Sequence, residues 1–204
     1  PDWFLVVNVP RLYQGKELRR SYVIWQEKQS PKVVVEFLSS GTESEDLGRF
    51  YQEGSNGEKE VQVEADVEDE ATQISPNPPG KFEVYEKYLR VPHYIVYSRY
   101  TQQLRYFQLE GKKYREQPLQ AENPRIWLTD LEVGLGIWTG EFEGVPSHWL
   151  RWCDGQGNCF LTDTEQAQAQ LRQAARNLMA TGMPVSQVAQ ILGLSEQEVQ
   201  EIDR

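Results

Sequence analysis

The sequence predicts an α/β fold in which a mixed β-sheet is flanked by helices and followed by a helical C-terminal tail. A continuous apolar run at residues 33–38 is typical of a strand that is buried on both faces. A segment with apolar residues at helical spacing, 82–89, precedes another strand-like run at 93–97, and this order of strand, helix and strand is typical of an α/β core. From residue 164 onward, helix-forming residues dominate.

The amino-terminal section is expected to be β structure. Apolar runs at 4–9 and 22–25 predict two strands before the one at 33–38, and proline and glycine residues separate the runs. A turn follows the third strand. After it, Thr42 or Ser44 is expected to cap a short helix.

Residues 52–79 have a different character, because glycine- and proline-rich stretches enclose an acidic middle. Alternating apolar residues at 61–67 are compatible with a marginal strand. A polar segment of this length is typical of a mobile surface insertion, and we interpret it as an acidic insertion in the first domain. A regulatory flap is the alternative interpretation.

Regular structure is expected again after the insertion. Phe82, Tyr85 and Leu89 recur at helical spacing, which predicts an amphipathic helix of about three turns that ends before Pro92. Further strands and short, aromatic-rich strands or loops are expected to complete the core, at 93–97, 104–109, 126–128, 137–138 and 149–152.

The C-terminal segment predicts three helices. One begins at Thr164, and Gly182-Met183-Pro184 ends it. Two short helices at 185–191 and 196–202 follow, with Ser195 as the N-cap of the second. The pair resembles a helix-turn-helix, but its second helix carries acidic side chains rather than the Arg, Lys, Asn or Gln that contact bases. The segment therefore predicts a packing or dimerisation tail.

The length of 204 residues accommodates one sizeable core and an appendage. We therefore predict a first domain at 1–160 and a helical tail at 161–204. The chain begins without Met on Pro1-Asp2, a pair that looks internal to a larger domain. We expect that an upstream part of this domain is missing.

The net charge of −10 argues against a uniformly basic surface for nucleic acid, because phosphate neutralisation requires Lys and Arg. Acidic residues concentrate between 43 and 70, whereas basic residues gather at 19–20, 87–90 and 112–115. A surface polarised in this way still permits a nucleic-acid backbone to bind locally.

The cysteines and the apolar segments bear on the cellular compartment. No apolar stretch approaches the roughly 18 residues of a membrane span, so no membrane partner is expected. Cys153 and Cys159 flank a turn and could pair, but two thiols in such a chain are more typical of a reducing cytoplasm. Zinc is not expected, because His93 and His148 show no ligand spacing. We therefore expect a cytoplasmic protein.

Glu36 is the most informative residue of the chain. A carboxylate inside a doubly buried strand is costly unless a cation, a proton or a hydrogen-bond donor compensates it. Asp2 and Glu36, on neighbouring predicted strands, are hard carboxylates of the kind that bind Mg²⁺, and Lys81 is a cation that could lie beside an attacking water. Spacing alone does not distinguish this trio from ordinary surface residues.

The order of these residues along the chain resembles the Uma family of restriction-endonuclease-like proteins, a branch of the PD-(D/E)XK nuclease superfamily. The resemblance covers residues 1 to roughly 152 and is carried by Pro1-Asp2, Val33–Ser39, Thr42, Asp46-Leu47-Gly48, Lys81–Tyr85 and Tyr94-Ile95-Val96. The superfamily places a lysine two residues after the strand acid, where this chain has Leu38. In the Uma branch the lysine lies on the following helix, and Lys81 matches that place.

The resemblance implies a restriction-endonuclease-like core that binds Mg²⁺ or Mn²⁺. Asp2, Glu36 and the backbone carbonyl of Phe37 are the implied metal ligands. Lys81 is implied to orient and activate the attacking water and to stabilise the pentacovalent phosphate. DNA is the implied partner, with the protein acting as a homodimer.

Two hydroxyl residues, Ser39 and Thr42, are candidates for positioning water or phosphate, although a hydroxyl directly after a strand is usually a turn former. Tyr85, one helical turn from Lys81, is expected to pack in the core.

Three functions remain open on the sequence. We predict a metal-dependent DNA endonuclease; the alternatives are a catalytically inactive binding or scaffold protein with the nuclease fold, and a transcription-associated protein that uses the C-terminal helices. Metal affinity distinguishes the first from the second. DNA binding that survives deletion of the residues after Leu161 would exclude the third.

Overall fold

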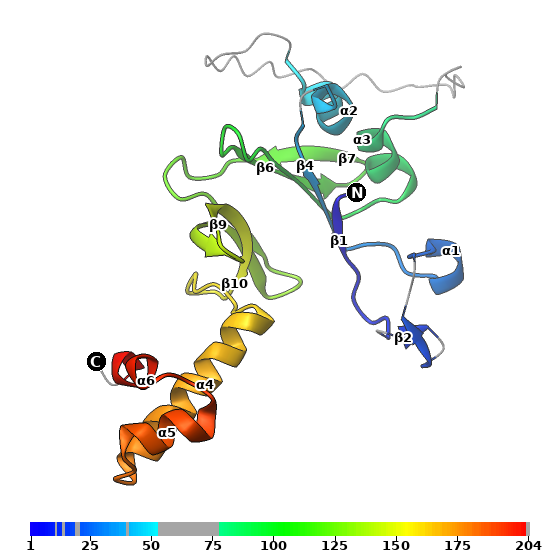
Figure 1. Cartoon of the computed structure of the whole chain (residues 1–204). Coiled ribbons are helices and arrows are strands. Elements are labelled where there is room, and N and C mark those ends of the chain that lie inside the picture. The colour runs from blue at the N-terminus through cyan, green and yellow to red at the C-terminus, as the bar shows by residue number, and fades with distance from the viewer. Residues whose placement is uncertain (11, 14, 19–20, 40, 53–77, 203–204) are drawn as a thin grey trace. The chain divides into compact units, whose positions relative to one another are not determined.

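The computed structural model describes residues 1–10, 12–13, 15–18, 21–39, 41–52 and 78–202 (Figure 1). These residues form two compact units, Pro1–Gly155 and Gln156–Arg204, and each is described by itself. The sequence places the boundary slightly later, between residues 160 and 161. Most of the acidic insertion, with its marginal strand at 61–67, lies outside the described residues, as does the basic pair at 19–20.

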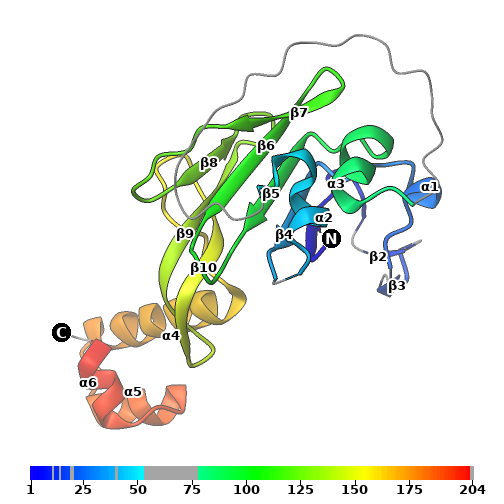
Figure 2. The same cartoon turned by 90° about the horizontal axis from the view of Figure 1, so that it is seen from above.

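A five-stranded mixed sheet forms the centre of the first unit (Figure 2). Its strands lie in the order β1-β4-β5-β6-β7, with the bounds β1 (Trp3–Leu5), β4 (Val33–Phe37), β5 (His93–Tyr97), β6 (Leu104–Glu110) and β7 (Lys113–Gln117). β4 and β5 are parallel, whereas the other neighbours in this sheet are antiparallel. The predicted α/β fold with a mixed sheet is therefore confirmed.

The segment between β4 and β5 crosses one face of this sheet. It contains α2 (Glu43–Leu47), a 3₁₀ turn (Gly48–Phe50), α3 (Lys81–Glu83) and a π-helical turn (Val84–Tyr88). Parallel neighbours need such a crossover, because the chain must return to the end of the sheet from which it started. Phe82 and Tyr85 of the crossover pack against Val34, Tyr94 and Phe107, and this aromatic cluster forms the core on that face.

The opposite face of the central sheet packs against a second, antiparallel sheet. Its order is β10-β9-β8, with the bounds β8 (Arg125–Leu128), β9 (Val133–Phe142) and β10 (Val145–Cys153). Val33 and Ile95 of the central sheet pack with Ile126, Leu128 and Leu135 of the second. The aromatic-rich segments expected at 126–152 therefore do pack against the core, but as longer strands that form a sheet of their own. A small hairpin, β2 (Leu12–Tyr13) and β3 (Glu17–Leu18), completes the strands.

The strand predicted at 22–25 is wrong, because these residues enter α1 (Ile24–Glu27), a single helical turn. Both edges of β4 are occupied, by β1 and β5, so no neighbouring strand remains there for this run. A left-handed residue, Lys28, closes the turn by donating its backbone N–H to the carbonyl of Ile24 at 2.7 Å. The strand predicted at 4–9 is shorter than expected, since β1 begins at Trp3 and ends at Leu5.

The helix predicted at 82–89 exists but begins at Lys81 and changes to a π-helical turn at Val84. Two consecutive residues of this turn, Tyr85 and Glu86, are both buried and both have polar partners. The π-helical turn is consistent with the burial of both side chains, because a π-turn redirects side chains relative to an α-helix. Such turns are frequent at functional positions.

The second unit consists of α4 (Asp163–Ala180), α5 (Val185–Leu192) and α6 (Glu196–Ile202). Its core contains Ala175, Val188, Ala189 and Val199. As predicted, Ser195 caps α6: its hydroxyl accepts from the Glu198 backbone N–H at 3.2 Å, and the Glu198 carboxylate accepts from the Ser195 N–H at 2.7 Å. The acidic side chains of α6 are exposed.

No helix within the described residues is long and apolar enough to cross a membrane. Cys153 and Cys159 are both thiols rather than partners in a disulfide.

The buried tyrosines predict a steep loss of stability in alkali. Burial is the largest cause that raises the pKa values of Tyr85, Tyr94, Tyr106 and Tyr114 above the ordinary 10.0. Because the unfolded chain then loses these protons first, their contribution is intact below pH 10 and is lost as the pH rises further, at about 1.4 kcal/mol per tyrosine and pH unit. We expect unfolding, measured by circular dichroism, within about two pH units above 10.

A pair of variants checks this expectation. Tyr114→Phe removes one buried phenol, so the free energy of unfolding should fall less steeply with pH above 10. Tyr100→Phe, at a side chain that is 68% exposed, should leave the slope unchanged. Equal slopes in the two variants would contradict the assignment.

Candidate active site

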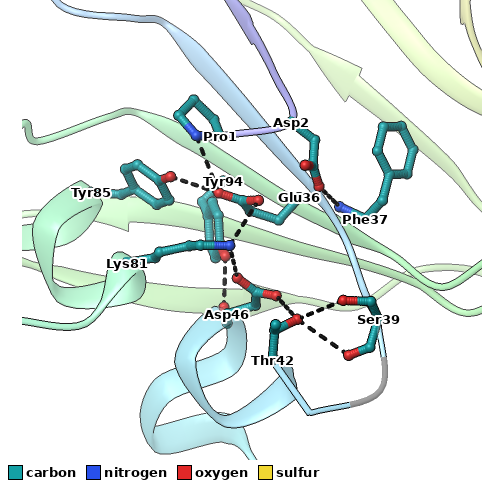
Figure 3. A network of polar contacts seen from close by, with 10 residues as sticks. All are labelled: Pro1, Asp2, Glu36, Phe37, Ser39, Thr42, Asp46, Lys81, Tyr85 and Tyr94. Carbon is teal, nitrogen blue, oxygen red and sulfur yellow. Dashed lines mark hydrogen bonds and ion pairs between the residues drawn. The ribbon is translucent and has the colours of Figure 1, made fainter.

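A buried carboxylate, Glu36, lies near the end of β4 and is 1% exposed. Side chains alternate along a strand, so Glu36 shares the crossover face of the sheet with Val34. The apolar neighbours on this face cannot compensate its charge, and its polar partners therefore decide whether glutamate is tolerated there. Figure 3 shows that these partners converge from α3, the π-helical turn after it and the segment before β1.

Lys81, the first residue of α3, lies between two carboxylates. Its ammonium nitrogen is 3.4 Å from Glu36 Oε2 and 2.9 Å from Asp46 Oδ1, and its side chain is 35% exposed. Desolvation by burial lowers the pKa of Lys81, but the hydrogen bond from Lys81 to Asp46 and the charges of Glu36 and Asp46 together outweigh it, so the pKa is raised above 10.5. Lys81 is therefore an ammonium at neutral pH, and it donates hydrogen bonds rather than accepting a proton.

Asp46 is as deeply buried as Glu36, at 1% exposed, and lies near the end of α2. Besides Lys81, its carboxylate accepts from the Thr42 hydroxyl at 2.8 Å, one helical turn earlier. Its backbone carbonyl accepts from the Tyr94 hydroxyl at 2.6 Å, which fixes α2 on the sheet. These contacts hold a second charged acceptor against Lys81.

The two predicted hydroxyl residues extend this network. Thr42 Oγ1 lies 2.8 Å from the Asp46 carboxylate, 3.2 Å from the Ser39 carbonyl and 3.1 Å from Ser39 Oγ. Its single proton is best donated to the charged carboxylate, so the Ser39 hydroxyl donates to Thr42 in turn. Thr42 occupies the predicted N-cap position of α2, but its hydroxyl makes no capping hydrogen bond to the backbone.

Tyr85 donates its hydroxyl to Glu36 Oε1 at 2.6 Å. The expectation that Tyr85 packs in the core is confirmed, since it is 5% exposed, but this polar contact was not anticipated. Burial, followed by the hydrogen bond to Glu36, raises the pKa of Tyr85 above its ordinary value. The phenol therefore keeps its proton and serves as a neutral donor to the carboxylate.

Asp2 joins the network through the backbone. Its Oδ2 accepts from the Phe37 N–H at 2.7 Å, next to Glu36 in β4, and its side chain is exposed. The Pro1 nitrogen lies 3.5 Å from Glu36 Oε1. Asp2 therefore lies at the end of β4 beside Glu36.

The charges of the cluster bear on the expected metal. Glu36, Asp46 and Asp2 all raise the pKa of Tyr85 through their charges, so three carboxylates lie near one phenol. Among the described residues, Lys81 is the side-chain cation that contacts Glu36 and Asp46. An excess of carboxylate oxygens fits the hard donors that Mg²⁺ and Mn²⁺ prefer. No group of three or more His, Cys, Asp or Glu residues in the described part is arranged as a ready metal site.

The structure brings the predicted residues together to different degrees. Glu36 and Lys81 are in direct contact, Ser39 and Thr42 reach Lys81 through Asp46, and Asp2 is attached to the amide that follows Glu36.

Two residues of the site, Asp46 and Tyr85, were not among the predicted site residues. The signal for Asp46 was its position four residues after Thr42, on one face of a short helix. The signal for Tyr85 was the same spacing from Lys81.

Comparison with known families identifies the first unit. The family model Uma2, described as "Putative restriction endonuclease", matches residues 1–139, which include Asp2, Glu36, Asp46 and Lys81. This match confirms the resemblance on which the sequence-based prediction rests. No curated protein and no solved structure matches the chain.

Replacement of Tyr85 by Phe tests the compensation of Glu36. The variant keeps the aromatic packing but removes a donor from a buried carboxylate, so we expect the free energy of unfolding to fall by about 1–3 kcal/mol. Urea denaturation measures it, and Tyr88→Phe, at a side chain that is 66% exposed, is the control. In a Glu36→Gln background the loss should shrink, because the charge that needed the donor is gone. Equal losses in both backgrounds would contradict the contact.

Proposed function

The chain belongs to the Uma2 family, and on this premise we propose that it is a metal-dependent DNA endonuclease that hydrolyses phosphodiester bonds. The observation that carries the proposal is the Lys81 ammonium, held between the buried carboxylates of Glu36 and Asp46. A buried pair of acids that fixes one partly exposed cation is an arrangement suited to a reaction that develops negative charge.

The metal in this proposal is Mg²⁺ or Mn²⁺, with Asp2, Glu36 and the Phe37 carbonyl as its ligands. Asp2 is exposed, and its Oδ2 is the oxygen that accepts from the Phe37 amide. When bound, the metal supplies a Lewis acid that polarises the scissile phosphate and lowers the pKa of bound water. The excess of carboxylate over lysine in the cluster supports this assignment.

Lys81 orients the attacking water and stabilises the pentacovalent phosphate in this mechanism. Its raised pKa supports these roles and argues against removal of a proton by Lys81 itself, because an ammonium has no acceptor. Asp46 acts as a positioning residue, since it anchors the ammonium at 2.9 Å without belonging to the proposed metal ligands.

The hydroxyls of Ser39 and Thr42 support Asp46 rather than lying free for substrate. Thr42 donates to Asp46 and receives from Ser39, so the pair is engaged within the network. We propose that the exposed Ser39 is the member that remains within reach of a phosphate or a water.

Three variants and one control test the proposal. We expect calorimetry to show Mn²⁺ and Mg²⁺ binding that Glu36→Gln abolishes and that Lys81→Ala retains. Plasmid cleavage should fall by about 10²–10³-fold in Lys81→Ala, because a preorganised cation is lost from the transition state. Lys87→Ala, on the following helical turn, should cleave like the parent. Asp46→Asn should retain metal binding and lower kcat by a smaller factor.

The combinations of results separate the functions that the sequence left open. Metal binding with no cleavage by the parent chain would favour a binding or scaffold protein with a retained nuclease fold. Cleavage that is unchanged in Lys81→Ala would refute the role of this lysine. The absence of metal binding would refute the proposed hydrolysis.

A further inference from the structure

A cavity of about 580 Å³ lies on the face of the central sheet opposite to Glu36. Its lining residues come from β5, β6 and β7 on one side and from β8 and the turn after it on the other. His93 of its lining pairs with Val33 of β4, whose side chain points away from the face that Glu36 occupies. The cavity is therefore separate from the candidate active site.

A buried polar chain forms one wall of this cavity. His93 is 4% exposed and Tyr106 is 6% exposed, whereas the Asp130 side chain is 51% exposed. His93 Nε2 lies 2.8 Å from Asp130 Oδ1, and His93 Nδ1 lies 2.8 Å from the Tyr106 hydroxyl. A carboxylate oxygen accepts, which assigns a proton to Nε2. In the tautomer with its proton on Nε2, Nδ1 is an acceptor, and the Tyr106 hydroxyl donates to it.

The direction of these hydrogen bonds determines what the wall offers to a ligand. Burial raises the pKa of Tyr106, so the phenol keeps its proton. Because His93 accepts that proton, the Tyr106 oxygen has only lone pairs left for a ligand. Asp130 is half-exposed and presents carboxylate lone pairs beside it. Both groups are hydrogen-bond acceptors, so a complementary ligand must bring N–H donors.

The other walls suit a flat molecule with polar edges. Trp127, which is 45% exposed, contributes an aromatic surface to the cavity. Gln108 is half-buried on β6, and its side chain makes no hydrogen bond within the part of the chain that the structure describes. Its amide can both donate and accept. A volume of this size accommodates a ligand as large as a nucleotide.

We propose that this cavity binds a guanine base, with Asp130 and Tyr106 accepting from its N–H groups, Gln108 meeting its acceptors, and Trp127 covering its ring. Guanine presents two adjacent donors, N1–H and the N2 amino group, on one edge and the acceptors O6 and N7 on another. Adenine and cytosine each present a single amino group beside a ring acceptor, which would face the Asp130 carboxylate unfavourably. The base can come from a free guanine nucleotide or from an unpaired guanine in a nucleic-acid strand.

This inference does not rest on the proposed nuclease activity. None of the residues that line the cavity belongs to the cluster of Glu36, Asp46, Lys81 and Tyr85. Glu36→Gln should therefore retain guanine binding even where cleavage is lost, and a failure of one proposal does not imply failure of the other.

Calorimetric titration of the full chain with GMP tests the inference, with AMP and CMP as competitors of the same charge. We expect GMP to bind at least about ten-fold more tightly than either. Asp130→Asn should lower the affinity for GMP by about ten- to hundred-fold. The asparagine amide can still accept from His93, but it turns an N–H donor toward the base. Glu132→Gln, an acid-to-amide change at an exposed residue of the same turn, should bind like the parent.

A second variant protects the test against misfolding. Gln108→Leu removes only a side-chain amide that has no partner among the described residues. It should weaken the binding of GMP while near-ultraviolet circular dichroism stays unchanged. Titration of a single-stranded oligonucleotide with one guanine, in the Glu36→Gln background, distinguishes the two sources of the base. If the oligonucleotide binds more tightly than GMP and Asp130→Asn loses this binding, the ligand is an unpaired guanine in a nucleic-acid strand.

Three outcomes would overturn the inference. The first is the absence of binding by both GMP and the oligonucleotide. The second is equal affinity for GMP, AMP and CMP, which would exclude recognition of the guanine edge. The third is GMP affinity that is the same in Asp130→Asn as in Glu132→Gln.

Discussion

The Glu36 carboxylate lies in a sheet face that is otherwise apolar and aromatic, and the crossover above that face supplies its partners. Lys81 and Tyr85 approach it from one helical turn and place a charge and a neutral donor on its two oxygens. Asp46 then holds Lys81 from α2. Because removal of a partner leaves a buried charge less fully compensated, β4, α2 and α3 depend on one another through this cluster.

A second buried acid on the same crossover, Glu86, forms an ion pair whose hydrogen bonds are all made within the fold. Glu86 is 3% exposed and receives two parallel hydrogen bonds from Arg49, at 2.8 and 2.9 Å, together with the Tyr114 backbone N–H. Its acceptors are engaged by the fold, which is the arrangement expected of a structural pair. The cluster around Glu36 differs because two buried carboxylates, Glu36 and Asp46, share one partly exposed cation, Lys81.

Much of the central fold follows from local sequence, and the errors have local causes. The runs at 33–38 and 93–97 became β4 and β5 because apolar β-branched and aromatic residues there suit a strand buried on both faces. The run at 22–25 has the same composition but forms α1, since an apolar run of four residues does not by itself distinguish strand from helix. The length of the aromatic strands β9 and β10 depended on their pairing with each other.

The sequence by itself determined that a charge at Glu36 needs a partner, because a carboxylate in an apolar strand must be compensated. The order of the family's residues pointed to Lys81, which does contact Glu36. Only the tertiary structure decided the remaining members. The spacing of Asp46 from Thr42 and of Tyr85 from Lys81 indicates local neighbours only. The contacts of Asp46 with Lys81 and of Tyr85 with Glu36 arise when the crossover folds onto the sheet. The physical reason is that a hydrogen bond between side chains 35 or 49 residues apart is specified by packing, not by local propensity.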